Sequence, residues 1–490
     1  MMLKSRTKIL FIMLTCFVSL KAQTVLTIDE AIKTAFENSP DIRRSILNLE
    51  RSQESLNAQN AALKSKFQLD LAPFEYSKNR QFFDFTSSWY TSENKTSGGT
   101  FSIVQPIVWT DGTLSINNNF EYRDSYSDNN SDNSKSFSNN LYLRFDQPLF
   151  TYNRTKIALS ELELDLENSS LSYAIQKLNI EKNVSESFYS LFRQRLSLQI
   201  ANEEYESQKS NYALTQNKVD AGILSQDERY QAELNMLNSE MSLKNAEVTL
   251  QNQYDQFKQL VGIPIDEEID IIADISYRHY DVDLTKAIQS GITKRMELRQ
   301  REIDVENSQF NLIKTSATNE FYGNLRLAVG LIGTDSDLAN IYDTPTNNQD
   351  FSMTFSIPLF DWGERSSRIK ASEKTIESSK INFDDQKNSI LVSIRSVYRN
   401  IQNMENQIKI SEISQRNAQL SYDINLERYS NGDLTSIDLQ GFQQQLSEAK
   451  MTKVQSLINY KLELLNMKIQ SLYDFEKNSP VVSDIKYIKE

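Results

Sequence analysis

The residues best suited to proton transfer or metal binding lie in one short segment. His279 is the only histidine, and it follows the carboxylates Glu267, Glu268 and Asp270. One histidine without a neighbouring cysteine offers too few ligands for a zinc site, and carboxylates in a polar linker are typical of a solvated surface. No phosphate-binding loop or nucleophile motif accompanies them. The sequence therefore predicts no catalytic residue, no cofactor and no metal.

Two short turns carry the other distinctive spacing. Gly222 precedes the segment 225–228 (Ser-Gln-Asp-Glu), and Gly432 precedes the segment 435–438 (Thr-Ser-Ile-Asp). Glycine suits the left-handed backbone at a helix end, and Ser or Thr with an acid three residues later is typical of a capped helix start. Each turn is therefore predicted to join two antiparallel helices.

Long segments without glycine or proline precede these turns. Residues 153–219 and 364–431 contain neither, and at about 1.5 Å per residue each helix would be on the order of 100 Å long. Return helices are predicted at 225–261 and 435–473. Apolar residues spaced four and three apart indicate coiled-coil seams in the first return helix, with an interruption between two sets. The sets are Tyr230, Leu234, Leu237, Met241 and Leu250, Tyr254, Phe257, Val261.

The chain is predicted to contain two copies of one structural unit. Residues 26–32 recur at 282–288, and Pro148-Leu149-Phe150 recurs at 358–360. The first match has an offset of 256 and the second an offset of 210, because the first copy has about 46 extra residues before Pro148. Matches that recur in the same order indicate an internal duplication. The predicted segments are a first repeat (23–262, strands at about 67–150), a linker (263–283), a second repeat (284–475, strands at about 320–360) and a tail (476–490).

Apolar and polar residues alternate between the helices. Leu141, Leu143 and Phe145 show this pattern, and so do residues 325–331. A period of two gives a strand one apolar and one polar face. The pattern fits a membrane barrel with lipid outside and a wet lumen inside, and it also fits a soluble, half-buried sheet. The polar runs at 124–140 and 332–349 are predicted to be loops.

The N-terminus has the pattern of a secretory signal. Basic residues precede the apolar run Ile9–Leu20, and Ala22 offers a cleavage site, so residues 1–22 are predicted to be a signal peptide. A membrane anchor and lipidation at Cys16, the only cysteine, are the alternatives. The net charge of −13 argues against a nucleic-acid partner, because phosphate binding needs clustered cations.

The predicted strands require more than one chain. Two membrane-type strands in each repeat give about four per chain, whereas the smallest outer-membrane barrels have about eight. An open sheet edge is not tolerated in lipid. Several chains are therefore predicted to share one barrel, and the helical hairpins likewise need neighbours to bury both faces.

Taken in order, these motifs resemble the TolC-like outer-membrane efflux proteins over essentially the whole mature length. The segments that carry the resemblance are Leu26–Ile32, Gln147–Phe150, Gly222–Ser225, Ile357–Gly363 and Gly432–Thr435. The resemblance implies an α+β membrane protein, a homotrimer whose 12-stranded outer-membrane β-barrel continues into a long periplasmic α-helical coiled-coil barrel.

The same resemblance implies a function without catalysis. The trimer would sit in outer-membrane lipid, extend into the periplasm, and act as the exit duct of a tripartite efflux or type I secretion system. Its partners would be a periplasmic adaptor (membrane fusion protein) and an inner-membrane pump. A periplasmic coiled-coil adaptor or a structural envelope protein is the alternative, although the duplicated hairpins and the scarcity of glycine argue against an adaptor.

The resemblance also assigns roles at the turns. The expected adaptor-docking residues are Gly222, Leu224, Ser225, Gly432, Leu434 and Thr435. An acid that lines the periplasmic constriction corresponds to Asp438, and a tyrosine–acid link between tip helices corresponds to Tyr429 and Glu228. A second acid of that constriction falls on Gly441, so the predicted ring is less acidic. Helix capping is the alternative role for Asp438 and Glu228.

Residues 98–140 depart from the family pattern. The segment Gln105–Trp109 is a third copy of the motif that ends the strands, and alternation resumes at Leu114 and Ile116. We expect an additional hairpin here, which either extends the barrel strands or decorates them.

Overall fold

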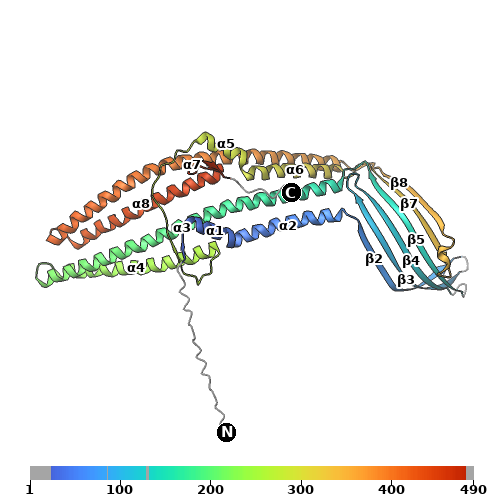
Figure 1. Cartoon of the computed structure of the whole chain (residues 1–490), viewed down its shortest axis with the longest axis horizontal. Helices are drawn as coiled ribbons and strands as arrows, with labels where there is room; N and C mark the ends of the chain where they lie inside the picture. Colours follow the sequence, from blue (N-terminus) through green and yellow to red (C-terminus); the bar gives the residue numbers. More distant parts are fainter. Residues whose placement is uncertain (1–23, 85–86, 128–131, 482–490) are drawn as a thin grey trace, which may run out of the picture. The chain divides into compact units, whose positions relative to one another are not determined.

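A computed structural model describes residues 24–84, 87–127 and 132–481 (Figure 1). The predicted signal peptide, residues 1–22, lies outside the described residues, as does most of the predicted tail. Contacts divide the chain into two units, one from Met1–Arg43, Lys177–Asp281 and Val397–Asn466, the other from Arg44–Gln176, Val282–Ser396 and Met467–Glu490. None of the described helices is both long and apolar enough to cross a bilayer.

Two long helical hairpins form most of the first unit. Helix α3 (Arg154–Asp220) turns into α4 (Gln226–Val261), and α7 (Glu364–Asn431) turns into α8 (Ser436–Ser471). Both α3 and α7 begin in the second unit and end in the first. Buried aromatic and branched apolar residues line the contacts between these helices in the first unit. They include Val184, Phe188, Leu191, Phe257, Ile408, Leu446 and Tyr460.

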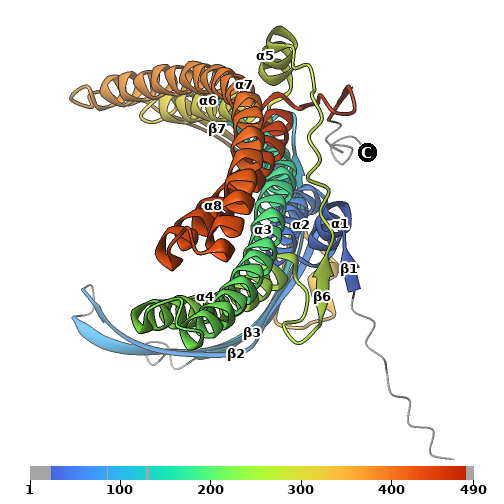
Figure 2. The same ribbon diagram turned by 90° about the vertical axis from the view of Figure 1, so that its left-hand side faces the viewer.

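The chain enters the first unit through a short parallel pair of strands. β1 (Thr24–Leu26) pairs with β6 (Ile269–Ile271), as Figure 2 shows. Helix α1 (Ile28–Asn38) follows and begins with a capping box, in which the side chains of Thr27 and Glu30 each accept the other's backbone N–H. The segment predicted as a linker thus contains a strand, β6, that pairs with β1.

The helices of the second unit flank the first part of α3 and of α7. They are α2 (Pro40–Ala62), α5 (Leu284–Lys294) and α6 (Met296–Ser316). Arg299 of α6 donates two hydrogen bonds to the carboxylate of Glu167 on α3, at 2.6 and 2.9 Å. Such a paired geometry fixes the orientation of both side chains. β9 (Tyr473–Asp474) and β10 (Ser479–Pro480) form a small hairpin after α8.

The described chain forms one antiparallel sheet of six strands, in the order β2-β3-β4-β5-β7-β8. Their bounds are Lys66–Phe83, Ser88–Ile107, Gly112–Ser127, Asp132–Leu149, Tyr322–Asp335 and Thr346–Ser356. The predicted number of about four strands per chain is therefore corrected. The difference is the additional hairpin β3–β4, which pairs with β2 on one side and β5 on the other instead of decorating the sheet.

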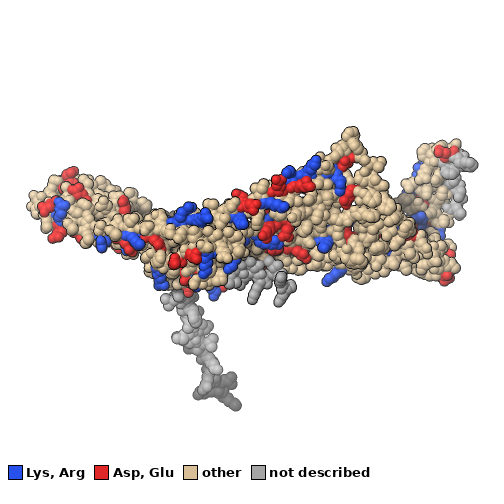
Figure 3. Space-filling view, turned by 90° about the horizontal axis from the view of Figure 1, so that it is seen from above, with Lys and Arg blue, Asp and Glu red and all other residues tan. Residues whose placement is uncertain are grey.

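Much of the sequence predicted to be loop belongs to these strands. β4 continues to Ser127, β5 starts at Asp132, and β7 and β8 extend into the run 332–349, where a short 3₁₀ helix (Asn340–Tyr342) connects them. The prediction failed because a ladder of backbone hydrogen bonds also holds polar strand ends that no apolar face marks. On the face in Figure 3, charged side chains are frequent over the helices and sparse over the middle of the sheet.

Candidate docking and gating site at the hairpin tips

The turn between α3 and α4 is a glycine-capped helix end. Gly222 has a φ of +73°, and the amides of Gly222 and Ile223 donate to the carbonyls of Val219 and Lys218, both at 2.9 Å. This is the Schellman arrangement, in which a left-handed residue ends the helix. Ser225 then starts α4 by accepting the backbone N–H of Glu228 at 3.4 Å.

The turn between α7 and α8 has the same construction. Gly432 has a φ of +88°, and the amide of Asp433 donates to the carbonyl of Arg428 at 2.9 Å. Thr435 accepts the backbone N–H of Asp438 at 3.2 Å and donates its hydroxyl to the Asp438 carboxylate at 2.7 Å. The exposed Asp438 therefore does act in helix capping, and its free carboxylate oxygen still faces solvent.

Both tips present open surface. A Cβ placed on Gly222 or Gly432 would meet no atom within 4 Å. Leu224 and Leu434, expected as docking residues, are only partly exposed, and Ser225 and Thr435 are exposed. Ile223 and Ile437, to which the sequence motifs assign no role, are the more exposed apolar side chains of the two tips. The isoleucine and the leucine of each tip together offer a small apolar surface that a protein partner could bind.

Hydrogen bonds join the two tips within one chain. The ring of Tyr429 is buried, with 2% of its surface exposed, and its hydroxyl is hydrogen-bonded to Thr215 of α3. Lys218 of α3 donates to the carbonyls of Tyr429 and Ser430 at 3.0 Å each. A cation at these carbonyls complements the negative end of the α7 dipole. The ends of α3 and α7 are therefore clamped together.

Tyr429 and Glu228 each form a hydrogen bond to another residue of this chain, whereas the resemblance implied a link between the two. The Tyr429 hydroxyl is bonded to Thr215, whereas the Glu228 carboxylate accepts the backbone N–H of Ser436, at the start of α8, at 3.4 Å. The two residues are on different helices and face different partners. Both residues lie at the contact between the two hairpins, and each forms a hydrogen bond with a residue of the other hairpin.

No sequence motif predicts Thr215 and Lys218 as part of the site. Their polar side chains lie in a helix without a motif, so nothing local marks them. One signal exists, because the offset that relates Gly222 to Gly432 also relates Lys218 to Arg428, and places a cation in the last turn of both long helices.

The segment around His279 forms structural contacts. His279 Nδ1 lies 2.7 Å from the Glu405 carboxylate, and Asp270 pairs with Arg195 at 2.6 Å. Burial is the main cause that raises the pKa of the nearby Tyr460 phenol, which donates to the carbonyl of Arg278. Within the residues that the structure describes, no three His, Cys, Asp or Glu side chains gather as metal ligands would.

Exposed apolar stripes follow the outer helices of the first unit. On α4 the predicted seam residues Tyr230, Leu234, Leu237 and Met241 are exposed, whereas Phe257 of the second set is buried within the chain. A similar exposed set lies on α7: Ile410, Ile413, Leu420 and Ile424. Apolar stripes of this length indicate protein contacts beyond the single chain.

A comparison with protein families decides the identity of this arrangement. The profile of the family described as "Outer membrane efflux protein" matches residues 112–263 and 294–467, which is more than half of the chain. The chain belongs to this family. It is accordingly an efflux channel of the outer membrane that extends into the periplasm, and the family is a channel family.

Relatives of the family cover most of the chain. "Outer membrane protein TolC" of Salmonella enteritidis is 20% identical over 369 residues, which are 72% of this chain and 73% of that protein. The CmeC outer membrane channel of Campylobacter jejuni has a similar fold, with a TM-score of 0.71, 14% identity, and coverage of 94% of this chain and 87% of CmeC. VceC of Vibrio cholerae superposes with a TM-score of 0.66 and 14% identity, over 91% of this chain and 96% of VceC.

Proposed function

We propose that three copies of this chain form the exit duct of a tripartite efflux or type I secretion system. The duct passes substrates from an inner-membrane pump and a periplasmic adaptor to the exterior, and it performs no catalytic step. The observation that carries this proposal is the matched pair of open, glycine-capped tips at the ends of two duplicated helical hairpins.

Surfaces left unpaired in one chain support the assembly of several copies. The exposed stripe on α4 and the exposed stripe on α7 are both apolar, and each lies on an outer helix of its hairpin. Contact between the α4 stripe of one copy and the α7 stripe of the next buries both. Burial of this kind stabilises by about 25 cal/mol per Å² of apolar surface.

The tips are the part of the molecule that fits an adaptor. Each offers an exposed isoleucine beside a rigid turn, and the turn's shape depends on a positive φ that glycine adopts without strain. Because both tips share this construction, an adaptor with one type of binding surface can engage either of them. We assign docking to Gly222, Leu224 and Ser225, and to Gly432, Leu434 and Thr435.

The test replaces the glycines by valine. A Cβ at Gly222 or Gly432 meets no neighbouring atom, but valine at either position imposes about 1–2 kcal/mol of backbone strain at a positive φ. We expect a reshaped tip, an intact oligomer, and loss of drug resistance in a host that depends on this channel. The control is Asn238→Val, because Asn238 is an exposed residue within α4, away from both turns.

Two measurements separate docking from folding. Resistance should fall in the two tip variants and stay at the wild-type level in the control, while the native mass of the detergent-extracted oligomer stays the same in all three. Loss of the oligomer in the tip variants would instead identify these glycines as folding residues, and full resistance would show that docking occurs elsewhere.

A further inference from the structure

The additional hairpin β3–β4 is an integral part of the sheet. β3 pairs with β2 from Lys66↔Val104 to Phe83↔Ser88, and β4 pairs with β5 from Thr113↔Asp146 to Ser127↔Asp132. These ladders are as long as the one that joins β5 to β7 across the two repeats. An appendage on the sheet would pair along only part of its length.

The hairpin carries the same apolar band as its neighbours. Register places Leu69 of β2 opposite Phe101 of β3, and Ile116 of β4 opposite Leu143 of β5. Phe101 and Ile116 are each 42% exposed and Leu143 is 46% exposed, so these side chains of the hairpin are exposed to a similar degree as that of β5. The whole band, called the apolar face below, runs across all of these strands. Its members are Leu69, Leu71, Phe101, Leu114, Ile116, Leu141, Leu143, Leu327, Val329, Leu331, Phe351, Met353 and Phe355.

The opposite face of the sheet is polar along the hairpin as well. Asn119 of β4 donates to Thr100 of β3 at 2.8 Å, and Asn117 donates to Ser115 at 3.1 Å. On the neighbouring strands Asp146 accepts from Arg326 at 2.9 Å. An apolar face opposite a polar face is the pattern of a strand with lipid on one side and a wet lumen on the other.

The base of the hairpin is fixed to a long helix. Asp111, in the β3–β4 turn, accepts the backbone N–H of Thr155 at 3.0 Å and a hydrogen bond from Arg154 at 2.9 Å. It therefore caps the start of α3. Partial burial raises the pKa of the Asp111 carboxyl, but the bonds from Thr155 and Arg154 outweigh this effect and hold the pKa below its ordinary value. Asn153 also donates to the carbonyl of Val108 at 2.6 Å.

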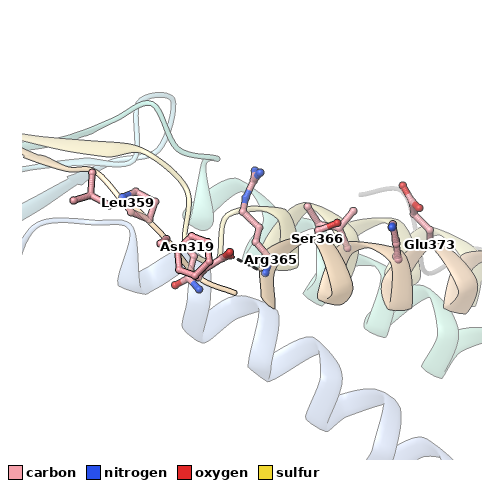
Figure 4. A pocket seen from close by; sticks show the side chains of 10 residues that line it. Asn319, Leu359, Arg365, Ser366 and Glu373 are labelled. Atoms are coloured by element: carbon pink, nitrogen blue, oxygen red, sulfur yellow. Dashed lines mark hydrogen bonds between the residues drawn. The ribbon is translucent and has the colours of Figure 1, made fainter. Parts of the chain in front are cut away.

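Exposed aromatic residues follow three of the strands. Trp109 follows β3, Phe150 follows β5, and Trp362 follows β8, and all are exposed, Trp109 at 84% and Trp362 at 90%. At the last of these junctions Leu359 is exposed beside a hollow that Arg365 and Asn319 also line (Figure 4). Exposed aromatic side chains near strand ends are typical of a membrane interface.

The outer strands of the sheet have free edges. β2 pairs only with β3, and β8 pairs only with β7, among the described residues. Paired residues connect Leu69, near the start of β2, across the sheet to Asn347, near the start of β8. Because β8 runs antiparallel to β2, these two residues belong to opposite ends of the sheet's strands. Such a stagger accompanies the strand tilt of closed barrels. A second copy of the chain offers β8 to β2 and satisfies the open backbone groups.

We propose that the hairpin β3–β4 crosses the membrane with the other strands, so that three copies of a six-stranded sheet close a barrel of 18 strands. This inference rests on the three-copy assembly proposed above. Barrel diameter grows roughly linearly with strand number, so this barrel is about one and a half times as wide as the expected 12-stranded one. The membrane section then passes bulky hydrophilic solutes, and the helical tips become the size-limiting part.

The test reads lipid contact at single cysteines in the purified channel. Phe101→Cys and Ile116→Cys probe the hairpin, Leu143→Cys is the matched position on β5, and Asn117→Cys probes the polar face. Each is labelled with a small fluorophore in proteoliposomes that contain spin-labelled lipid. We expect both hairpin positions to be quenched as strongly as Leu143→Cys, and at least about twice as strongly as Asn117→Cys, because the two faces alternate.

Each outcome has one meaning. Weak lipid quenching at Phe101→Cys and Ile116→Cys, beside strong quenching at Leu143→Cys, places the hairpin outside the bilayer and overturns the inference while the channel function stands. Weak quenching at Leu143→Cys removes the proposed function itself. Electron cryomicroscopy of the same preparation should show 18 strands in cross-section, and a ring of 12 would overturn the inference independently.

Discussion

A few polar side chains decide how firmly the two hairpin tips of one chain are held together. Thr215 is fully buried, and its hydroxyl already donates to the carbonyl of Asn211 at 2.7 Å. The Tyr429 hydroxyl must therefore be the donor in the bond between them. Lys218 adds two charge-assisted bonds to the end of α7, so a movement that separates the hairpins has to break all three.

Removal of the Tyr429 hydroxyl should loosen this clamp. Tyr429→Phe deletes one buried hydrogen bond, and we expect a loss of about 1 kcal/mol in local stability. Hydrogen exchange of the amides near the ends of α3 and α7 should accelerate by about fivefold, the equivalent of that energy. The control is Tyr422→Phe, since its hydroxyl pairs with the partly exposed Ser207 at 3.0 Å. Equal acceleration in both variants would argue against a clamp at Tyr429.

The carboxylate of Asp438 has two candidate roles, which one substitution can separate. Asp438→Asn keeps an oxygen that accepts the Thr435 hydroxyl, yet it removes the charge. If three such carboxylates line a constriction, block of the channel by divalent cations should weaken several-fold in single-channel recordings, with little change in stability. Unchanged block would leave Asp438 as a helix cap alone.

At the scale of elements, the sequence predicts what short-range chemistry determines. The absence of Gly and Pro predicts α3 and α7 nearly to the residue, and Gly222 with Ser225 predicts the turn. The bounds of the strands are harder to predict, because alternation of apolar and polar residues marks only the apolar part of each strand. The polar end of β5 is held by backbone pairing with β4 and has no pattern of its own.

The same limit applies to the candidate site. Gly222, Gly432 and the two caps are local features, so their residue types and spacing alone predict them. The partners of Tyr429 and Glu228 depend on how two helices far apart in sequence pack, and the expected contact between them is replaced by contacts with Thr215 and Ser436. The extra hairpin is predictable as a hairpin, but only its pairing with β2 and β5 shows that it belongs to the sheet.

At the scale of the whole molecule, the unpaired surfaces are more informative than the buried ones. Among the described residues, both outer strands of the sheet have a free edge, and exposed apolar stripes lie on α4 and on α7. Closed cyclic assemblies use one surface to bind a different surface on the next copy. In the proposed assembly, one chain therefore carries both halves of a repeating contact, in the strands and in the helices alike.

Charges placed on the α4 stripe should dissociate the assembly. The double variant Leu234→Glu with Leu237→Glu places two carboxylates in this stripe. Burial of each leucine side chain in the assembly would otherwise stabilise the contact by about 1.5–3 kcal/mol. Both leucines are about half exposed in the single chain, so the monomer should still fold. Light scattering in detergent should give about three times the chain mass for the wild type and a single chain for the variant. Asn238→Glu with Ser242→Glu is the control, because it adds the same charge to exposed polar positions of α4. A trimer in the stripe variant would mean that this surface faces the adaptor, the lumen or solvent, and the free strand edges alone would then have to account for assembly.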